Sequence, residues 1–322
     1  MTSRNTAPVP PGLGFGGAPI GGLYAPVQEG VATATVRRAY ETGIRYFDTA
    51  PHYGAGLAET RLGRALAAVP RDTYALSTKV GRRLAPGAGA DPQGFAEQLD
   101  LHREWDFSAG GIRRCLEDSL ARLGVDRVDV AYLHDPDDHE DAVYATAFPA
   151  LAALRDEGLV GAIGAGMNQS AMLTRFVNRL DIDIVLLAGR YTLLDQSGLD
   201  DLLPACLAKG VSVVIGGVYN SGLLADPRPG ARYDYAEAPP DLVTRAKRVA
   251  DACAAHGVSV RAAALRFPTG HPAVANVLVG CRTPEEVDDN VAMFGTPVPA
   301  ALWDDLRSSG LLREDAPVPE AR

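Results

Sequence analysis

Hydrophobic positions along the chain follow two different spacings. Short and almost continuous apolar runs predict strands that are buried on both faces, as in a parallel sheet. Between these runs, apolar residues recur every three or four positions, which is typical of amphipathic helices. We expect eight strands, at residues 13–17, 44–48, 74–79, 128–134, 159–165, 183–187, 211–217 and 274–280.

The predicted helices fill the intervals between these strands. The clearest is IRRCLEDSLARLG (112–124), where Gly124 ends the run. Thr283 and Pro284 are typical of the N-cap and first residue of a later helix. Eight strands alternating with eight helices predict an α/β fold, a single (β/α)8 TIM barrel spanning residues 1–322. The other helices are expected at 31–42, 57–68, 146–157, 169–180, 199–209 and 240–256.

A doubly wound open sheet is the alternative architecture. It requires a glycine fingerprint between its first strand and first helix, and LGFGGAPIGG (13–22) matches that fingerprint poorly. Two segments, 81–108 and 218–239, are longer than ordinary connections. In a barrel, long loops after the strands build the site at the carboxyl-terminal face. We therefore expect these two segments to enclose the site.

Composition narrows the classes of function. The chain has 322 residues, 47% of them hydrophobic, and a formal net charge of -9. This acidity argues against a nucleic acid partner. No apolar run approaches the roughly 18 residues of a membrane helix, and the first residues lack the apolar core of a secretory signal. We expect a cytoplasmic protein without a membrane partner.

The four cysteines are far apart in the sequence and form no C-x-x-C pair. A disulfide framework or a zinc site is therefore not expected. The cysteines are interpreted as small core residues. They are Cys115, Cys206, Cys253 and Cys281.

Polar residues end three successive predicted strands. Asp48, Lys79 and His134 occupy these positions, and Tyr53 follows Asp48 by five residues. Each has an ordinary structural explanation, such as a turn residue or, for His134, a hydrogen bond to the adjacent Asp135. At one barrel mouth, however, the four side chains can converge.

The four residue types together suit proton transfer. A tyrosine hydroxyl has an ordinary pKa of about 10, and a nearby ammonium such as Lys79 favours its phenolate. Asp48 would hold Lys79 in place, and His134 would orient a substrate oxygen. The sequence offers no nucleophile elbow and no cluster of metal ligands. A bound cofactor is therefore expected to supply the difficult step.

Several strings resemble the aldo-keto reductases over nearly the whole chain. They are GIRYFDTAPHYGAGLAETRLGRAL (43–66), STKVGR (77–82), SLARLGVDRVDVAYLHDPD (119–137) and GAGMN (164–168). Segments 189–207 and 215–225 are most similar to the bacterial L-fucose / D-threo-aldose 1-dehydrogenase branch, which includes pyridoxal 4-dehydrogenase.

This resemblance implies the cofactor and the site residues. The cofactor is a nicotinamide dinucleotide, and the catalytic tetrad maps onto Asp48, Tyr53, Lys79 and His134. From the positions of the residues themselves, substrate contacts are expected from His52, Trp105 and Tyr219, and no metal site is expected. The cofactor-binding residues implied are Asp48, Asn168 (nicotinamide carboxamide), Ser221, Gly222 and Leu223 (pyrophosphate), and Gly280, Arg282, Thr283, Glu286 and Asn290 (adenosine end).

The chain departs from the family pattern around the nicotinamide. Met167 replaces a common serine, and Ala188 replaces the usual glutamine of the sixth strand. The position of the usual stacking aromatic falls on Gly216 or Gly217. Either Tyr219 or another loop residue takes its role, or the nicotinamide ring is held more loosely.

Glu286 bears on the choice of cofactor. A carboxylate at this position would repel the 2′-phosphate of NADP and accept a hydrogen bond from a free ribose hydroxyl, as in other NAD sites. We expect NAD to be preferred, although Arg282 leaves NADP open. The alternative interpretation is a capping box formed by Thr283 and Glu286, which needs no ligand.

The sequence thus predicts an oxidoreductase that passes a hydride from a sugar C1 hydroxyl to NAD and forms a lactone. The alternatives on the same scaffold are a pyridoxal 4-dehydrogenase and a general aldehyde or ketone reductase. More remote ones are a metal-dependent lyase or hydrolase using Asp48, His52 and His134, and a non-catalytic dinucleotide sensor. A chelator would separate the metal-dependent class from hydride transfer.

Overall fold

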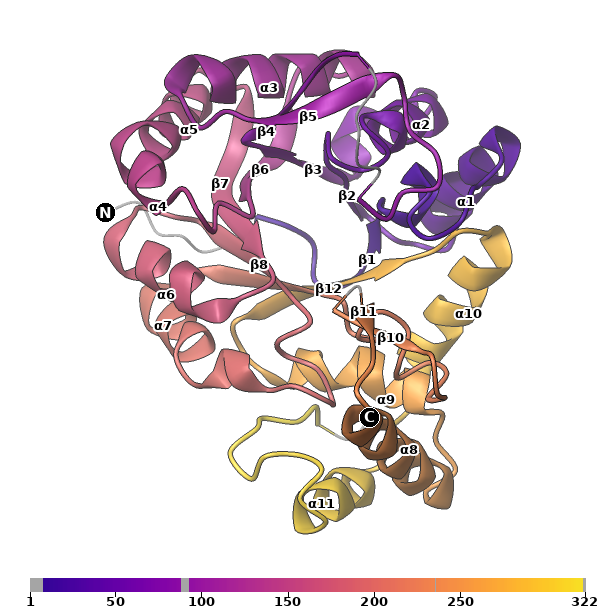
Figure 1. The fold of residues 1–322 in the computed structure, drawn as a ribbon. Coiled ribbons are helices and arrows are strands. Elements are labelled where there is room, and N and C mark those ends of the chain that lie inside the picture. The colour runs from indigo at the N-terminus through magenta and orange to yellow at the C-terminus, as the bar shows by residue number, and fades with distance from the viewer. Residues whose placement is uncertain (1–7, 88–92, 235, 321–322) are drawn as a thin grey trace.

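The computed structural model describes residues 8–87, 93–234 and 236–320. Eight parallel strands of the described residues close into a barrel in which each strand pairs with its neighbours in chain order (Figure 1). The predicted barrel is thereby confirmed. The strands are β1 (Gly12–Gly16), β2 (Tyr46–Asp48), β3 (Ala75–Val80), β6 (Val128–His134), β7 (Val160–Met167), β8 (Ile184–Ala188), β9 (Ser212–Gly216) and β12 (Val274–Gly280).

Helices surround the barrel as an outer ring (Figure 1). The predicted caps are present: Gly124 adopts the left-handed conformation after α3, and Thr283 Oγ1 accepts the Glu286 N–H at the start of α10. The ring consists of α1 (Glu29–Glu41), α2 (Leu57–Leu66), α3 (Ala109–Leu123), α5 (Phe148–Asp156), α6 (Ser170–Arg179), α7 (Leu202–Lys209), α9 (Val260–Arg266) and α10 (Pro284–Gly295).

We expected one helix between β9 and β12, but the described residues there form two α-helices. The predicted helix at 240–256 is present as α8 (Pro240–Ala255), but it lies outside the ring against α11 (Ala300–Ser308). The helix beside α10 in the ring is α9, which was not predicted. Shorter helical segments are η1 (Pro19–Gly21), η2 (Arg71–Thr73), α4 (Glu140–Ala142), η3 (Val143–Ala147), η4 (Ser197–Leu199) and η5 (Phe267–Gly270).

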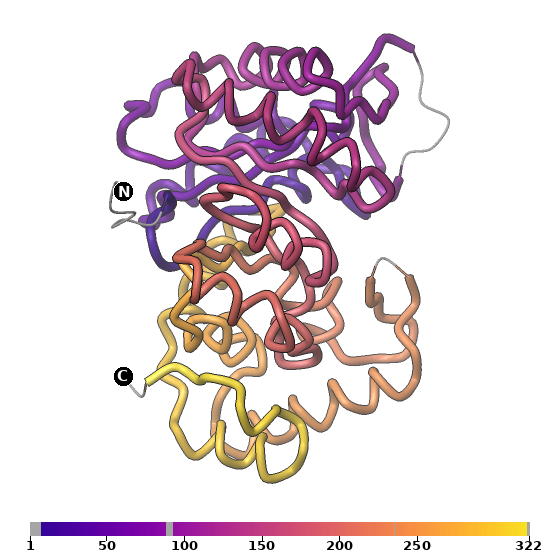
Figure 2. Tube along the Cα trace, turned by 90° about the vertical axis from the view of Figure 1, so that its left-hand side faces the viewer, coloured from indigo at the N-terminus to yellow at the C-terminus, as the bar shows by residue number. Residues whose placement is uncertain are grey.

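The two long segments contain small antiparallel ribbons rather than plain loops. In 81–108, β4 (Arg82–Pro86) pairs with β5 (Leu101–Trp105), so that Arg82 faces Trp105 across the ribbon. In 218–239, β10 (Arg232–Tyr233) pairs with β11 (Ala236–Glu237). Figure 2 shows both excursions on the side of the molecule away from the two termini. They extend from the carboxyl-terminal face of the barrel, as expected.

The barrel interior is filled by side chains below this face. Tyr46 and Tyr132 are fully buried there among aliphatic residues, and their hydroxyls are joined by a hydrogen bond of 3.0 Å. All four cysteines are buried and free. Within the described residues, no helix is both long and apolar enough to cross a bilayer.

Candidate active site

The four residues of the predicted tetrad meet at the carboxyl ends of β2, β3 and β6. Lys79 Nζ donates to Asp48 Oδ2 at 2.6 Å and to Tyr53 Oη at 2.9 Å. A third bond, to the Thr49 carbonyl at 3.0 Å, completes the three donors of the ammonium. The His134 ring stands perpendicular to the Tyr53 ring, with centroids 5.9 Å apart. The strand ends thus assemble the tetrad that the sequence predicted.

Hydrogen bonds to polar residues of the barrel interior hold the Asp48 side chain. Its Oδ1 accepts the Ser77 hydroxyl at 2.7 Å, and Ser77 is joined in turn to the Tyr46 hydroxyl at 2.9 Å. The Tyr46 hydroxyl is in turn hydrogen-bonded to the Tyr132 hydroxyl. With both carboxylate oxygens engaged, the Asp48 side chain has one orientation, and it fixes Lys79 beside Tyr53.

Burial and charge act in opposite directions on the two proton-transfer groups. Burial lowers the pKa of the Lys79 ammonium, but Asp48 and Tyr53 outweigh it, so the pKa lies above its ordinary value. Burial raises the pKa of Tyr53, while Lys79 opposes the rise. Lys79 is therefore charged, and the phenolate of Tyr53 depends on it.

Two neutral imidazoles line the same cavity. Burial, and then the charges of Arg82 and Lys79, lower the pKa of His134 well below its ordinary value. Burial, followed by Arg82, Arg103 and Lys79, lowers the pKa of His52 to about 2. Among the described residues, none forms a hydrogen bond with the buried Nδ1 atom of either ring. Both residues line the first cavity, where their rings can contact a ligand.

Two cavities join at the tetrad. The first, of about 280 Å³, is lined by His52, Lys79, His134 and Asn168, among others. The second, of about 310 Å³, runs from Asp48 past the glycine-rich ends of β1, β9 and β12. The residues that line both cavities are Ala18, Leu23, Tyr53, Leu186 and Ala188.

The second cavity suits an extended dinucleotide. Several of its walls are glycines without a side chain, and at Gly222 an added Cβ would meet no atom within 4 Å. Such walls let a ligand approach the backbone closely. Asp48 and Tyr53 line this cavity where it meets the first one, so a nicotinamide held there would lie next to the first cavity. The residues present therefore fit a nicotinamide cofactor.

A strained loop borders this second cavity. Asn220, Ser221 and Gly222 all have positive φ angles, of 48°, 57° and 99°. Non-glycine residues adopt this conformation at a cost, and such strain concentrates at functional sites. Ser221 and Gly222 line the cavity as expected, whereas Leu223 is fully buried and packs into the core. Only two of the three residues expected at the pyrophosphate thus line this cavity.

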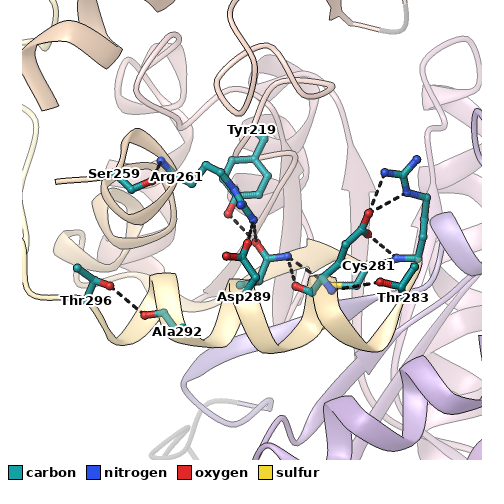
Figure 3. A network of polar contacts seen from close by, with 11 residues as sticks. Tyr219, Ser259, Arg261, Cys281, Thr283, Asp289, Ala292 and Thr296 are labelled. Carbon is teal, nitrogen blue, oxygen red and sulfur yellow. Dashed lines mark hydrogen bonds and ion pairs between the residues drawn. The ribbon is translucent and has the colours of Figure 1, made fainter. Parts of the chain in front are cut away.

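The amino terminus of α10 carries the pair expected at the adenosine end. The Glu286 carboxylate accepts the Arg282 backbone N–H at 2.7 Å and its guanidinium Nη2 at 2.8 Å (Figure 3). The predicted capping box is therefore altered: Thr283 caps the Glu286 N–H, but Glu286 reaches past Thr283 to Arg282. Glu286 thus forms an ion pair with Arg282 at this helix terminus.

Asn290 joins this helix to Tyr219, whose ring Figure 3 shows above α10. Its Oδ1 accepts the Tyr219 hydroxyl at 2.7 Å and Arg261 Nη2 at 3.3 Å, and its Nδ2 donates to the Glu286 carbonyl. Tyr219 is therefore directed toward α10, and it lines the second cavity rather than the first. This placement favours a role at the cofactor over the substrate contact or nicotinamide stacking expected for Tyr219.

Sequence reasoning missed one charged pair on the wall of the first cavity. Arg82 Nη2 donates to Asp135 Oδ2 at 2.7 Å, and both residues line the cavity. The hydrogen bond to Asp135 that was the alternative explanation of His134 is not formed, since His134 Nε2 lies 3.7 Å from Asp135 Oδ2. Trp105 does not line the cavity. Its ring packs against the Arg82 guanidinium, whose Cζ lies 4.3 Å from the ring centroid.

The metal-dependent alternative finds no support in the arrangement of side chains. Both carboxylate oxygens of Asp48 already accept hydrogen bonds, one from Ser77 and one from Lys79. Across the described ranges, no group of three or more His, Cys, Asp or Glu side chains is placed to hold a metal ion.

Comparison with known proteins agrees with this geometry. The model of the aldo/keto reductase family matches residues 12–310. The chain is 43% identical to a D-threo-aldose 1-dehydrogenase from Pseudomonas sp (94% of each chain) and 39% identical to a pyridoxal 4-dehydrogenase from Microbacterium luteolum (93% of this chain and 94% of that one). A solved aldo-keto reductase from Bacillus halodurans, in its holo form, superposes with a TM-score of 0.72 at 28% identity, covering 96% of this chain and 93% of that one. The chain therefore belongs to the aldo/keto reductase family and is an NAD(P)-dependent oxidoreductase.

Proposed function

We propose that this enzyme oxidises the C1 hydroxyl of a cyclic aldose to a lactone, with NAD as the preferred acceptor. The observation that carries the proposal is the position of Tyr53 at the junction of the two cavities, bonded to a buried ammonium. A substrate in the first cavity and a dinucleotide in the second would both reach this hydroxyl.

The residues of the tetrad divide the work of proton transfer. The bound dinucleotide supplies the hydride acceptor. Tyr53, as phenolate, takes the proton of the C1 hydroxyl, and Lys79 stabilises that phenolate. Neutral His134 donates a hydrogen bond to the substrate oxygen and orients it, while Asp48 keeps Lys79 in place. In the reverse direction the Tyr53 phenol returns the proton to a carbonyl oxygen.

The preference for NAD rests on Glu286. Its carboxylate pairs with Arg282 and carries the charge that would repel a 2′-phosphate. The free ribose hydroxyl of NAD can instead donate to a carboxylate. A ratio of kcat/KM for NAD over NADP well above one is expected, and a ratio at or below one would contradict the preference.

The substrate proposal draws on the relative that is 43% identical and named for D-threo-aldoses. Pyridoxal is the second candidate, because a relative 39% identical over nearly the same span is named for its 4-dehydrogenation. A screen that follows reduced cofactor with L-fucose, D-arabinose, L-galactose, pyridoxal and simple aldehydes separates them. Turnover of pyridoxal without turnover of any aldose would overturn the sugar assignment.

We also place this reaction in the cytoplasm. The four cysteines are free, and burial raises the pKa of each of their thiols, as suits unreactive residues in a reducing compartment.

A further inference from the structure

An ion pair that the tetrad chemistry does not use forms part of the wall of the first cavity. Arg82 begins β4, three residues after Lys79, and Asp135 directly follows His134. Their side chains are only 15% and 22% exposed. The Trp105 ring packs against the Arg82 guanidinium. The pair is thus fixed in place beside two catalytic residues.

Maintaining this pair costs stability. Taking two charges out of water is unfavourable unless their bonding is nearly complete. In addition, Asp135 has a φ of +40°, a left-handed conformation that a non-glycine residue adopts only where the surroundings impose it. Burial raises the pKa of Asp135 and Arg82 opposes the rise. A strained, partly buried ion pair in a catalytic cavity is typical of a functional group rather than of a structural support.

The Asp135 carboxylate retains hydrogen-bonding capacity toward the cavity. Oδ2 receives Arg82 and lies 3.7 Å from His134 Nε2. Among the residues that the structure describes, none donates a hydrogen bond to Oδ1. A carboxylate accepts hydrogen bonds from hydroxyl groups, and a guanidinium donates to them. The Asp135 carboxylate therefore offers an acceptor to a hydroxyl group in the cavity.

We propose that Asp135, positioned by Arg82, recognises the hydroxyl groups next to the reacting carbon, so that the cavity selects polyhydroxylated substrates over unsubstituted aldehydes. This inference rests on the proposed function in one respect: the reacting oxygen must lie between Tyr53 and His134. The closeness of Asp135 to His134 then brings the adjacent carbons of the substrate to the carboxylate.

The test compares two aldehydes of equal length, one with hydroxyl groups and one without. For wild type and Asp135→Asn, kcat/KM is measured in the reducing direction with glyceraldehyde and with propionaldehyde. Asparagine keeps the size of the side chain and tolerates the left-handed backbone, so the variant changes mainly the charge. The ratio of the two kcat/KM values should fall by about five- to tenfold, which is the effect of replacing a hydrogen bond to a charged acceptor by one to a neutral acceptor.

Two further variants separate recognition from indirect effects. Asp138→Asn removes the same charge from an exposed position three residues further on and should leave the ratio unchanged. Arg82→Gln should lower the ratio in the same direction as Asp135→Asn, because it removes the partner that holds the carboxylate. Matched thermal unfolding curves would show that each variant is folded.

The outcomes distinguish this inference from the proposed function. An equal loss with both aldehydes, or an unchanged ratio in Asp135→Asn, overturns the recognition role. An enzyme that reduces both aldehydes but oxidises no aldose contradicts only the lactone-forming reaction, and the ratio still decides the role of Asp135. If neither aldehyde is reduced, an aldose and its 2-deoxy analogue replace them in the same comparison. Absence of turnover with all four substrates contradicts both proposals.

Discussion

Two ion pairs of nearly equal length mark the two ends of the proposed dinucleotide site. Lys79 and Asp48 are 2.6 Å apart and their side chains are 2% and 3% exposed. Arg282 and Glu286 are 2.8 Å apart, but their side chains are 51% and 34% exposed. The first pair joins the ends of two barrel strands, whereas the second lies within one turn of a helix terminus.

The environment, rather than the distance, decides what each pair can do. In the dry barrel mouth the Lys79 charge acts strongly on Tyr53, since little water screens it. At the surface, water and salt weaken the pairing of Arg282 with Glu286, so either group can change partners at small cost. The buried pair is therefore suited to chemistry and the exposed pair to a choice between cofactors.

The largest effect should come from the group that the buried pair serves. Replacement of Tyr53 by phenylalanine removes the hydroxyl but keeps the ring, and kcat should fall by about 10²- to 10⁴-fold. The dissociation constant for NAD, measured by titration calorimetry, should remain within about threefold of wild type, because the ring still lines the second cavity. A variant that retains most of its kcat would show that another group transfers the proton.

The two ion pairs should differ most clearly in their contribution to the free energy of unfolding. Lys79→Met leaves Asp48 buried without its cation, which should reduce the free energy of unfolding by about 3–5 kcal/mol. Arg282→Met breaks a pair of similar length at the surface and should cost less than about 0.5 kcal/mol. Chemical denaturation of both variants measures the difference directly. Equal losses would mean that burial does not distinguish the two pairs.

The sequence predicted the barrel because its strands are buried on both faces and appear as unbroken apolar runs. It missed α9 for a related reason: VRAAALR has several fully buried residues and shows little contrast between a polar and an apolar face. The ribbon of β4 and β5 was missed because its register depends on pairing between segments that lie 14 residues apart in the chain.

The same limit applies to the site. Asp48, Lys79 and His134 were predicted because position at a strand end is visible in one dimension. The pairing of Arg82 with Asp135 was not, because it depends on how the ribbon folds over the barrel mouth. Likewise, the attachment of Tyr219 to Asn290 joins residues 71 positions apart, and it redirected Tyr219 from the substrate to α10.

The pH dependence of kcat should report the protonation of Tyr53, which the buried pair of Lys79 and Asp48 influences. Oxidation needs the phenolate, and burial raises the pKa of Tyr53 above its ordinary value. The kcat for oxidation should therefore rise with pH from about pH 6 to pH 9, by up to about tenfold per unit where proton transfer limits the rate. Reduction needs the phenol, which is protonated over this range, and its kcat should stay level.

A control for this profile comes from His134. Because the pKa of His134 lies well below its ordinary value, its titration should not appear near pH 6.5. A fall in both directions of reaction below about pH 7 would instead indicate that a charged His134 forms in this range.

The smallest effect should appear at the exposed pair, as a change in cofactor preference. Glu286→Gln keeps a side chain that can accept the Arg282 N–H, as glutamine does in capping boxes, but it removes the negative charge. The Arg282 guanidinium then becomes available to a 2′-phosphate. We expect the ratio of kcat/KM for NADP over NAD to rise by about tenfold, the effect of one charged contact. Glu285→Gln, on the exposed surface of the same helical turn, is the matched control. An unchanged ratio in Glu286→Gln would assign the carboxylate to capping alone, and the choice of cofactor would then depend on other residues.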